Sequence, residues 1–233
     1  MKGGFLALAI LAGFVLVGGV SCSLAFTTIH ARYRLTVEVQ DGDRIMSGSS
    51  VIDVSYDIYP DDFVSLGGPD DHPRYVGYAP TVDLGNRGLL FMTFESMERT
   101  PAQRIARNND ISCPFSDIGC LVFAAYDERG TNVGLPYSQK KAALYVVLRK
   151  NGPRDVPFTM LPMLARLQNI NAPGTLVQVS PYDLEASFGP GVRLKRVVLQ
   201  LTKDPVTPPP RTWPHWLREK GQMASILKGY HND

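Results

Sequence analysis

The side chains best suited to metal chemistry gather in one acidic segment. They are Asp57, Asp61, Asp62, Asp70, Asp71 and His72. Calcium prefers oxygen ligands such as carboxylates. Dedicated calcium loops, however, place their carboxylates at alternating positions around a glycine. The segment Gly67-Gly68-Pro69-Asp70-Asp71 does not have this spacing. A solvated loop is therefore expected from Tyr59 to Pro73, with Asp70, Asp71 and His72 as weak metal-ligand candidates.

The four histidines are not spaced for catalysis or for zinc binding. They are His30, His72, His215 and His231. None stands near a nucleophile on a sharp glycine turn, and no two have the helical spacing of a metal pair. Hydrolysis needs a nucleophile, a base and an oxyanion donor assembled by the fold. No catalytic residue and no cofactor is predicted, and the chain is not expected to be an enzyme.

Two of the three cysteines form a disulfide candidate. Cys113 and Cys120 are close enough in sequence to close a small loop, and the chain-entropy model gives such a bridge about 2.5 kcal/mol. A disulfide fits an oxidising compartment, and the alternative is a pair of ordinary core residues. A zinc site is not expected, because no third or fourth ligand stands nearby.

The N-terminal segment predicts a membrane location. From Gly3 to Ile29 no residue is charged, and residues 5–26 are almost entirely apolar. A helix of about 20 such residues is long enough to cross a hydrocarbon core. The favoured interpretation is an uncleaved anchor within residues 1–29.

Two alternatives to an uncleaved anchor remain open. Small residues before Ala25 suit cleavage of a signal peptide near that residue, and Cys22 is a lipidation candidate. The flanking charges do not settle the membrane orientation, because Lys2 on one side is matched by Arg32 and Arg34 on the other.

Composition excludes some function classes and favours a β-rich fold. The net charge is only +2, with both signs interspersed, so a nucleic-acid partner is not expected. The 18 prolines and 21 glycines suit short strands and turns better than a helical bundle. Arg193, Lys195 and Arg196 form one basic stripe, and Arg149-Lys150 forms another. These basic residues fit either phosphate head groups or an ordinary charged outer face, and the second interpretation is favoured.

Two alternating runs predict a hairpin in the N-terminal half. The apolar members of the two runs are Tyr33, Leu35, Val37 and Val39, followed by Ile52, Val54, Tyr56 and Ile58. Polar residues separate most of them, as in half-buried strands. Because Asp41-Gly42 breaks the first run, a longish loop is expected, and the apolar rows should fix the pairing register.

A second hairpin is predicted between residues 76 and 94. Strand spacing resumes over residues 76–84, Gly85 to Gly88 supply turn residues, and Leu89 to Phe94 form a further strand. Thr100 to Arg107 begins with a capping residue followed by proline, which predicts a short helix.

The middle of the chain predicts one strand and two helical segments. Apolar residues alternate from Ala142 to Leu148, which favours a strand, and Pro162 to Leu167 suits a helical turn. A helix capped by Ser180 should run to Phe188 and end at Gly189.

The C-terminal part predicts a strand, a stiff connector and a short helix. The strand runs from Val192 to Thr202, and its change of apolar phase indicates a bulge near Arg196 or burial on both faces. Prolines make residues 205–214 a stiff, extended connector. Trp213 and Trp216 belong to an amphipathic helix that either anchors at a membrane interface or packs on the domain, and packing is favoured.

These elements predict an α+β fold that is mainly antiparallel β. The expected organisation has an N-terminal transmembrane or signal helix in residues 1–29 and one β-rich globular domain with a few short helices in residues 30–204. Residues 205–233 complete it as a proline-rich connector with a short amphipathic helix.

Four sequence blocks resemble an uncharacterised proteobacterial family. They are Ser47 to Ile52, Val82 to Gly85, Phe188 to Arg196 and Asp204 to Thr207. The similarity spans most of Arg32 to Thr207 and implies a membrane-anchored or exported β-rich protein. It implies no activity, because the family has no assigned function.

The sequence thus predicts a non-enzymatic envelope protein that binds a protein or a membrane component. The expected location is the inner membrane, single-pass, with the globular domain in the periplasm of a Gram-negative cell. An exported small-ligand or ion-binding module that uses the acidic segment is the alternative, and a hydrolase with an unconventional site ranks third.

Overall fold

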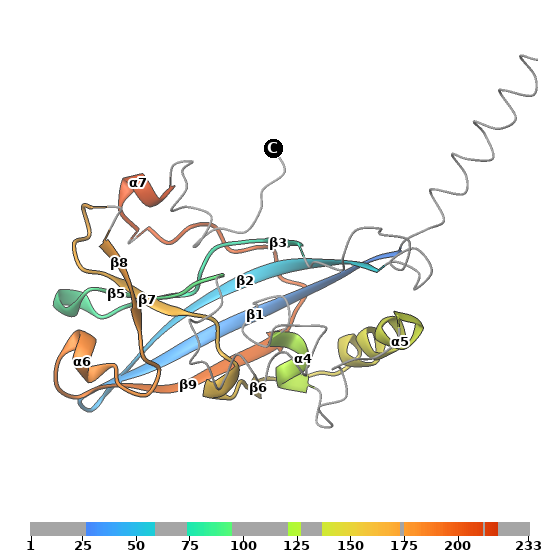
Figure 1. The fold of residues 1–233 in the computed structure, drawn as a ribbon, viewed down its shortest axis with the longest axis horizontal. Helices are drawn as coiled ribbons and strands as arrows, with labels where there is room; N and C mark the ends of the chain where they lie inside the picture. The colour runs from blue at the N-terminus through green and yellow to red at the C-terminus, as the bar shows by residue number, and fades with distance from the viewer. Residues whose placement is uncertain are drawn as a thin grey trace, which may run out of the picture.

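The computed structural model describes residues 27–58, 74–94, 121–126, 137–172, 175–211 and 213–218. Within these ranges the chain is mainly antiparallel β-sheet with a few short helices, which confirms the predicted β class (Figure 1). The apolar N-terminal run up to Phe26, the acidic loop from Tyr59 to Pro73 and the helix predicted over Thr100 to Arg107 lie outside the described residues.

Two sheets and several short helices make up the described fold. The five-stranded sheet has the order β3-β2-β1-β9-β6 and the four-stranded sheet the order β4-β5-β7-β8. The strands are β1 (Thr27–Asp41), β2 (Arg44–Ile58), β3 (Arg74–Val76), β4 (Thr81–Asp83), β5 (Leu89–Met92), β6 (Arg154–Asp155), β7 (Leu164–Leu167), β8 (Leu176–Val179) and β9 (Val192–Leu201). The α-helices are α4 (Leu121–Tyr126), α5 (Tyr137–Leu148), α6 (Glu185–Phe188) and α7 (His215–Arg218), and the 3₁₀ turns are η1 (Gly85–Arg87) and η3 (Phe158–Met160).

Strand β1 is the centre of the large sheet. It pairs with β2 along its whole length and with β9 from Tyr33 to Asp41. Its inward row is at most 5% exposed and consists of Ile29, Ala31, Tyr33, Leu35, Val37 and Val39. The described side chains between them are half-buried or exposed. The predicted alternation is confirmed, and a slip of one residue would turn this row to solvent.

The turn between β1 and β2 is shorter than predicted. Asp41 pairs with Arg44, so Gly42 and Asp43 alone form the turn. Gly42 has a φ of 60°, and a glycine with positive φ at the first turn position matches a type II′ turn. The longish loop expected after Asp41 is therefore wrong.

Strand β2 carries small inward residues where β4 crosses it. A β-carbon on Gly48 would lie 1.8 Å from the carbonyl oxygen of Thr81. Ser50, on the same face, is 3% exposed, and its Oγ has no hydrogen-bond partner in the described structure. Because aliphatic side chains are lacking here, the alternating apolar pattern did not predict this part of the strand. The same lack lets the backbones of the two sheets approach closely.

A single apolar core joins the two sheets and the helices. The four-stranded sheet lies toward the turn end of the β1–β2 hairpin, whereas α4 and α5 lie toward its open end (Figure 1). Tyr126 of α4 donates a hydrogen bond to the Gly152 carbonyl and accepts one from the Leu201 amide. These bonds fix α4 beside the end of β9.

Two predicted elements are of the wrong type. The strand predicted over Ala142 to Leu148 is the second half of α5, in which Leu144 and Val147 are buried and Val146 is 59% exposed. This three-residue spacing is helical. The helical turn predicted over Pro162 to Leu167 is instead strand β7, which pairs with both β5 and β8. Residues on both faces of β7 are buried, so its sequence does not alternate.

Two other predicted elements are confirmed in part. The second hairpin is present as β4 and β5 around η1, but Val76 belongs to β3 and pairs with β2. The helix predicted from Ser180 begins later, at Glu185, and ends at Phe188 as predicted. Gly189 follows it with a φ of 92°, a conformation that favours glycine.

Strand β9 contains the predicted bulge. Glu38 pairs with Arg196, but Val39 pairs with Leu194, so Lys195 is an extra residue in β9. Lys195 and Arg196 are both exposed, and the next apolar residue is buried again. The change of apolar phase in the sequence therefore marks the position at which the strand bulges.

The segment after β9 crosses the outer face of the large sheet. Asp204 Oδ2 accepts a hydrogen bond from Arg34 at 2.7 Å, and the Thr207 amide donates to the Val51 carbonyl at 3.2 Å. Thr207 Oγ1 also accepts from the Val51 amide at 2.8 Å. Arg34 and Val51 are directly opposite in the hairpin, so the crossing segment passes over Val51. This explains why Val51, in the outer row, is only 1% exposed.

Trp213 ends this crossing segment inside the core. Its side chain is 1% exposed and meets the rings of Tyr78 and Phe91 edge-on at centroid distances of 5.8 and 5.9 Å. Its Nε1 donates to Thr81 Oγ1 at 2.8 Å. The predicted packing is confirmed for Trp213, while the side chain of Trp216 lies outside the described part.

The close contact between the sheets predicts opposite effects for two neighbouring substitutions. Gly48→Ala places a methyl group against the β4 backbone and should lower the free energy of unfolding by about 2 kcal/mol or more. Ser50→Ala removes an unsatisfied buried hydroxyl and should leave stability unchanged or raise it by about 1 kcal/mol. Denaturant unfolding of both variants checks the pair. Equal destabilisation by both would contradict the contact.

Candidate functional site

An open groove of about 450 Å³ lies at the turn end of the large sheet. It is formed by η3, by the chain from Pro181 through the start of α6, and by the first residues of β9. We call it the tip groove, because the Gly42 amide at the hairpin turn donates to the Gly191 carbonyl beside it at 3.1 Å. Its size falls within the range of small-ligand and side-chain pockets.

The tip groove has an apolar floor and an aromatic wall. The buried floor residues are Pro181, Leu184, Val192 and Leu194. The wall is Tyr182, which meets Phe158 edge-on at a centroid distance of 6.1 Å. Tyr182 is 70% exposed, the most exposed large hydrophobic side chain in the described structure. Two aromatic rings over an apolar floor offer recognition by packing.

Three charged side chains line the same groove. Arg193 Nε donates to Glu185 Oε1 at 3.1 Å, and the Gly191 amide donates to the same oxygen at 3.3 Å. Asp183 Oδ1 accepts from the Ala186 amide at 3.1 Å. Among the described residues no cation pairs with Asp183. The groove therefore has one neutralised pair and one carboxylate without a cationic partner.

A half-buried arginine, Arg87, acts as a clamp on the turn that shapes this groove. Arg87 Nη1 donates to the carbonyls of Phe188 and Pro190 at 2.9 and 3.0 Å, and its Nη2 lies 3.2 Å from Asp41 Oδ1. Gly191 follows with a φ of 84° and leads directly into β9. The clamp ties the hairpin turn, η1 and the α6–β9 connection together.

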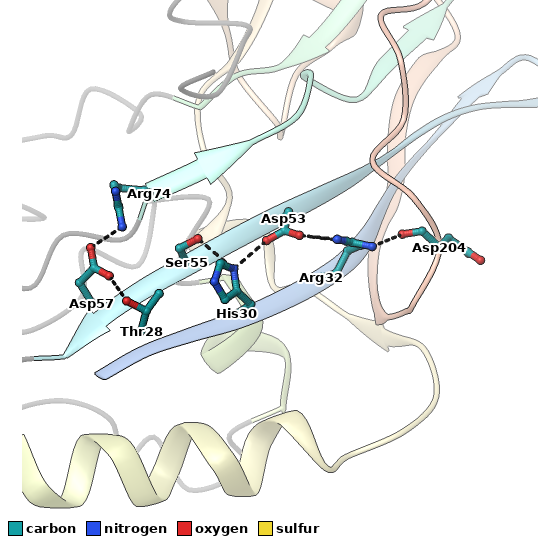
Figure 2. Close-up of polar contacts among 8 residues, drawn as sticks. All are labelled: Thr28, His30, Arg32, Asp53, Ser55, Asp57, Arg74 and Asp204. Carbon is teal, nitrogen blue, oxygen red and sulfur yellow. Dashed lines mark hydrogen bonds and ion pairs between the residues drawn. The ribbon is translucent and has the colours of Figure 1, made fainter. Parts of the chain in front are cut away.

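A second group of polar side chains lies on the outer face of β1 and β2 (Figure 2). Arg32 Nη2 lies 2.6 Å from Asp53 Oδ2, and Arg32 Nη1 donates to the Asp204 carbonyl at 3.3 Å. Asp57 accepts from Thr28 Oγ1 at 2.7 Å and pairs with Arg74 at 2.8 Å. This row of opposite charges cross-links neighbouring strands.

The same row includes a serine, a histidine and an aspartate, but not in a catalytic arrangement. Ser55 Oγ lies 3.1 Å from His30 Nδ1, and Asp53 Oδ1 lies 3.5 Å from that same nitrogen (Figure 2). A hydrolytic triad requires the serine at one ring nitrogen and the carboxylate at the other, so that the ring can transfer a proton. One nitrogen facing both partners cannot do this. Asp53 is moreover held by Arg32.

The two basic clusters named from the sequence differ in their surroundings. Arg196 forms a bidentate hydrogen bond with Glu38, at 2.9 and 2.8 Å, and Arg193 pairs with Glu185. The hydrogen bond from Arg196 lowers the pKa of Glu38, and the same bond raises the pKa of Arg196. These two arginines belong to an ion-paired outer face, as the favoured interpretation expected. Arg149 and Lys150 directly follow α5, and Lys150 Nζ donates to the Tyr126 carbonyl at 3.0 Å.

Most site residues named from the sequence fall outside the described residues. They are Cys22, Asp70, Asp71, His72, Cys113 and Cys120. In the ranges that the structure covers, no group of three or more His, Cys, Asp or Glu residues has metal-binding geometry. In those same ranges no helix has the length and apolarity needed to cross a membrane.

The sequence did not single out the tip groove. Its lining comes from three separate segments, around Phe158, Tyr182 and Val192, none of which forms a motif alone. The Phe188 to Arg196 block was one of the four that carry the family resemblance, and its residues Val192, Arg193 and Leu194 line the groove. The one available signal was an aromatic residue and a carboxylate side by side at Tyr182 and Asp183, directly before a short helix.

Comparison with known proteins gives no match. No family model matches the chain, and neither a curated protein nor a solved structure matches it significantly.

The hydrogen bond between Arg34 and Asp204 predicts a measurable lowering of the pKa of Asp204. Hydrogen bonds from Arg34 and Thr202 lower the pKa of Asp204. A carboxyl with a lowered folded pKa stabilises the fold above its unfolded pKa, near 4, and this contribution is lost as the pH falls through the folded value. Arg34→Gln should therefore raise the pKa of Asp204 toward its ordinary value, as measured by NMR titration. Arg74→Gln, which removes the partner of Asp57, is the control and should leave the Asp204 midpoint unchanged.

Proposed function

We propose that this protein is a non-enzymatic, membrane-anchored envelope protein that binds a partner through the tip groove. The observation that carries the proposal is the placement of the groove relative to Thr27, where the apolar N-terminal segment joins the sheet. Thr27 begins β1 at one end, and the hairpin turn beside the groove ends it at the other (Figure 1). A strand of 15 residues spans roughly 50 Å. The groove would thus be held well away from an anchoring bilayer.

The open end of the hairpin supports this orientation. Helix α5 lies beside that end of β1 (Figures 1 and 2). Its Tyr145 and Val146 are 43% and 59% exposed, and the exposed Arg149 follows the helix. Aromatic, aliphatic and basic side chains together suit a bilayer interface. We place this end toward the membrane and the tip groove toward the periplasm, with export after cleavage near Ala25 as the alternative.

The chemistry of the groove favours binding over turnover. Its described lining contains no serine, cysteine or histidine to act as nucleophile or general base. The Glu185 carboxylate already accepts hydrogen bonds from the Gly191 amide and from Arg193. An exposed aromatic ring above a buried apolar floor instead has the character of a binding anchor.

Photocrosslinking tests the proposed binding site. A benzoylphenylalanine probe at Tyr182 should yield a discrete adduct with a partner in native cells, because this side chain is exposed over the groove. The matched control is the same probe at Tyr145, an exposed tyrosine of α5, the helix that lies toward the open end of the hairpin (Figure 1). The Tyr182 adduct should be absent from the control. No adduct at Tyr182, or the same adducts at both positions, would contradict partner binding through the groove.

Membrane extraction tests the proposed anchor. An uncleaved apolar helix should resist alkaline carbonate, and deletion of residues 5–26 should abolish membrane association. Cys22→Ser should leave membrane association unchanged, because a spanning helix needs no lipid. Release of the Cys22→Ser protein into the soluble fraction would instead establish lipidation, and a full-length soluble product would contradict the anchor.

A further inference from the structure

We propose that the tip groove recognises a lysine or arginine side chain of a protein partner. This inference rests on the proposed function and names the chemistry of its ligand. It combines two observations: a carboxylate without a cationic partner, and an exposed aromatic wall beside it.

One negatively charged side chain in the groove has no cationic partner among the described residues. Arg193 is the one cation among the described lining residues, and Glu185 neutralises it at 3.1 Å. Asp183 uses Oδ1 to accept from the Ala186 amide, and its Oδ2 has no partner among the described residues. Its negative charge is therefore complementary to a single cationic group.

The aromatic wall suits the same cation. Tyr182, adjacent to Asp183 in the chain, exposes most of its ring and is steadied by the edge-on contact with Phe158. A cation within about 6 Å of an aromatic centroid is attracted by the ring. In the described part of the chain this interaction occurs at two places, with Arg154 at 5.9 Å from the Tyr126 ring and Arg166 at 5.3 Å from the Phe188 ring.

The apolar floor accounts for the rest of the ligand. Lysine and arginine carry an aliphatic stem that packs on apolar surface while the charged head stays polar. Pro181 and Leu184 are buried residues in the lining of the same groove and would receive such a stem. A small anion fits less well, because Arg193 is already paired and Asp183 would repel it.

Peptide binding to the full-length protein in detergent tests this assignment. A glycine-serine peptide with one central lysine should bind wild-type protein, and its acetyl-lysine counterpart should bind about tenfold more weakly, because acetylation removes the charge. Fluorescence anisotropy measures both affinities. Binding should also weaken with added salt, since the charges are exposed.

Two substitutions locate the recognition. Asp183→Asn keeps an acceptor for the Ala186 amide but removes the charge, and should weaken lysine-peptide binding about tenfold. Tyr182→Phe keeps the aromatic ring and should bind the lysine peptide nearly as well as wild type. Tyr182→Leu removes the ring and should lower the affinity several-fold. Asp155→Asn, at an exposed carboxylate on β6, is the control and should have no effect.

Each outcome bears on the proposal in a defined way. Equal binding of lysine and acetyl-lysine peptides, or wild-type affinity in Asp183→Asn, would overturn the assignment of a cationic ligand. Binding of a neutral oligosaccharide or of a polyanion in place of the lysine peptide would overturn it too. The Tyr182 crosslink separates these outcomes from a failure of the proposed function. If a partner adduct forms at Tyr182 but the lysine peptide does not bind as expected, the groove binds a partner and only the assigned ligand class is wrong.

Discussion

The uninterrupted inward row of β1 is the constraint on which the rest of the structure depends. Its six side chains from Ile29 to Val39 form the base of the core, and both neighbouring strands take their register from it. Because β1 is continuous for 15 residues, it also separates the two ends of the domain. The glycine turn, the arginine clamp and the groove lie at one end, and α5 lies at the other.

Local irregularities adapt this regular sheet to its neighbours. The Gly48 position admits the β4 backbone, and the extra Lys195 in β9 brings Arg196 opposite Glu38. The segment through Asp204 and Thr207 then closes over the outer face. Gly48 permits a close approach between the two sheets, whereas the bulge and the segment after β9 add ion pairs on the outer face of the large sheet.

Periodicity predicted the elements in which apolar and polar residues alternate, and it failed for α5 and β7, in which they do not. The alternation of β1, the bulge in β9 and the end of α6 were all visible in the sequence. All seven residues from Ala142 to Leu148 are apolar, so their pattern was compatible with a strand or with a helix. In the structure they are helical, and Leu144 and Val147 pack into the core. β7 is buried on both faces. The tip groove escaped prediction because its three segments meet only after folding.

The antiparallel pairing of β1 and β9 has a mechanical consequence. An anchored chain would be pulled at Thr27, and an occupied groove would be pulled where β9 starts, at the opposite end of the same pair. Tension along this line slides the two strands past one another, so their rungs resist collectively rather than opening one after another. The β1–β9 pairing is therefore suited to withstand traction applied between Thr27 and the groove.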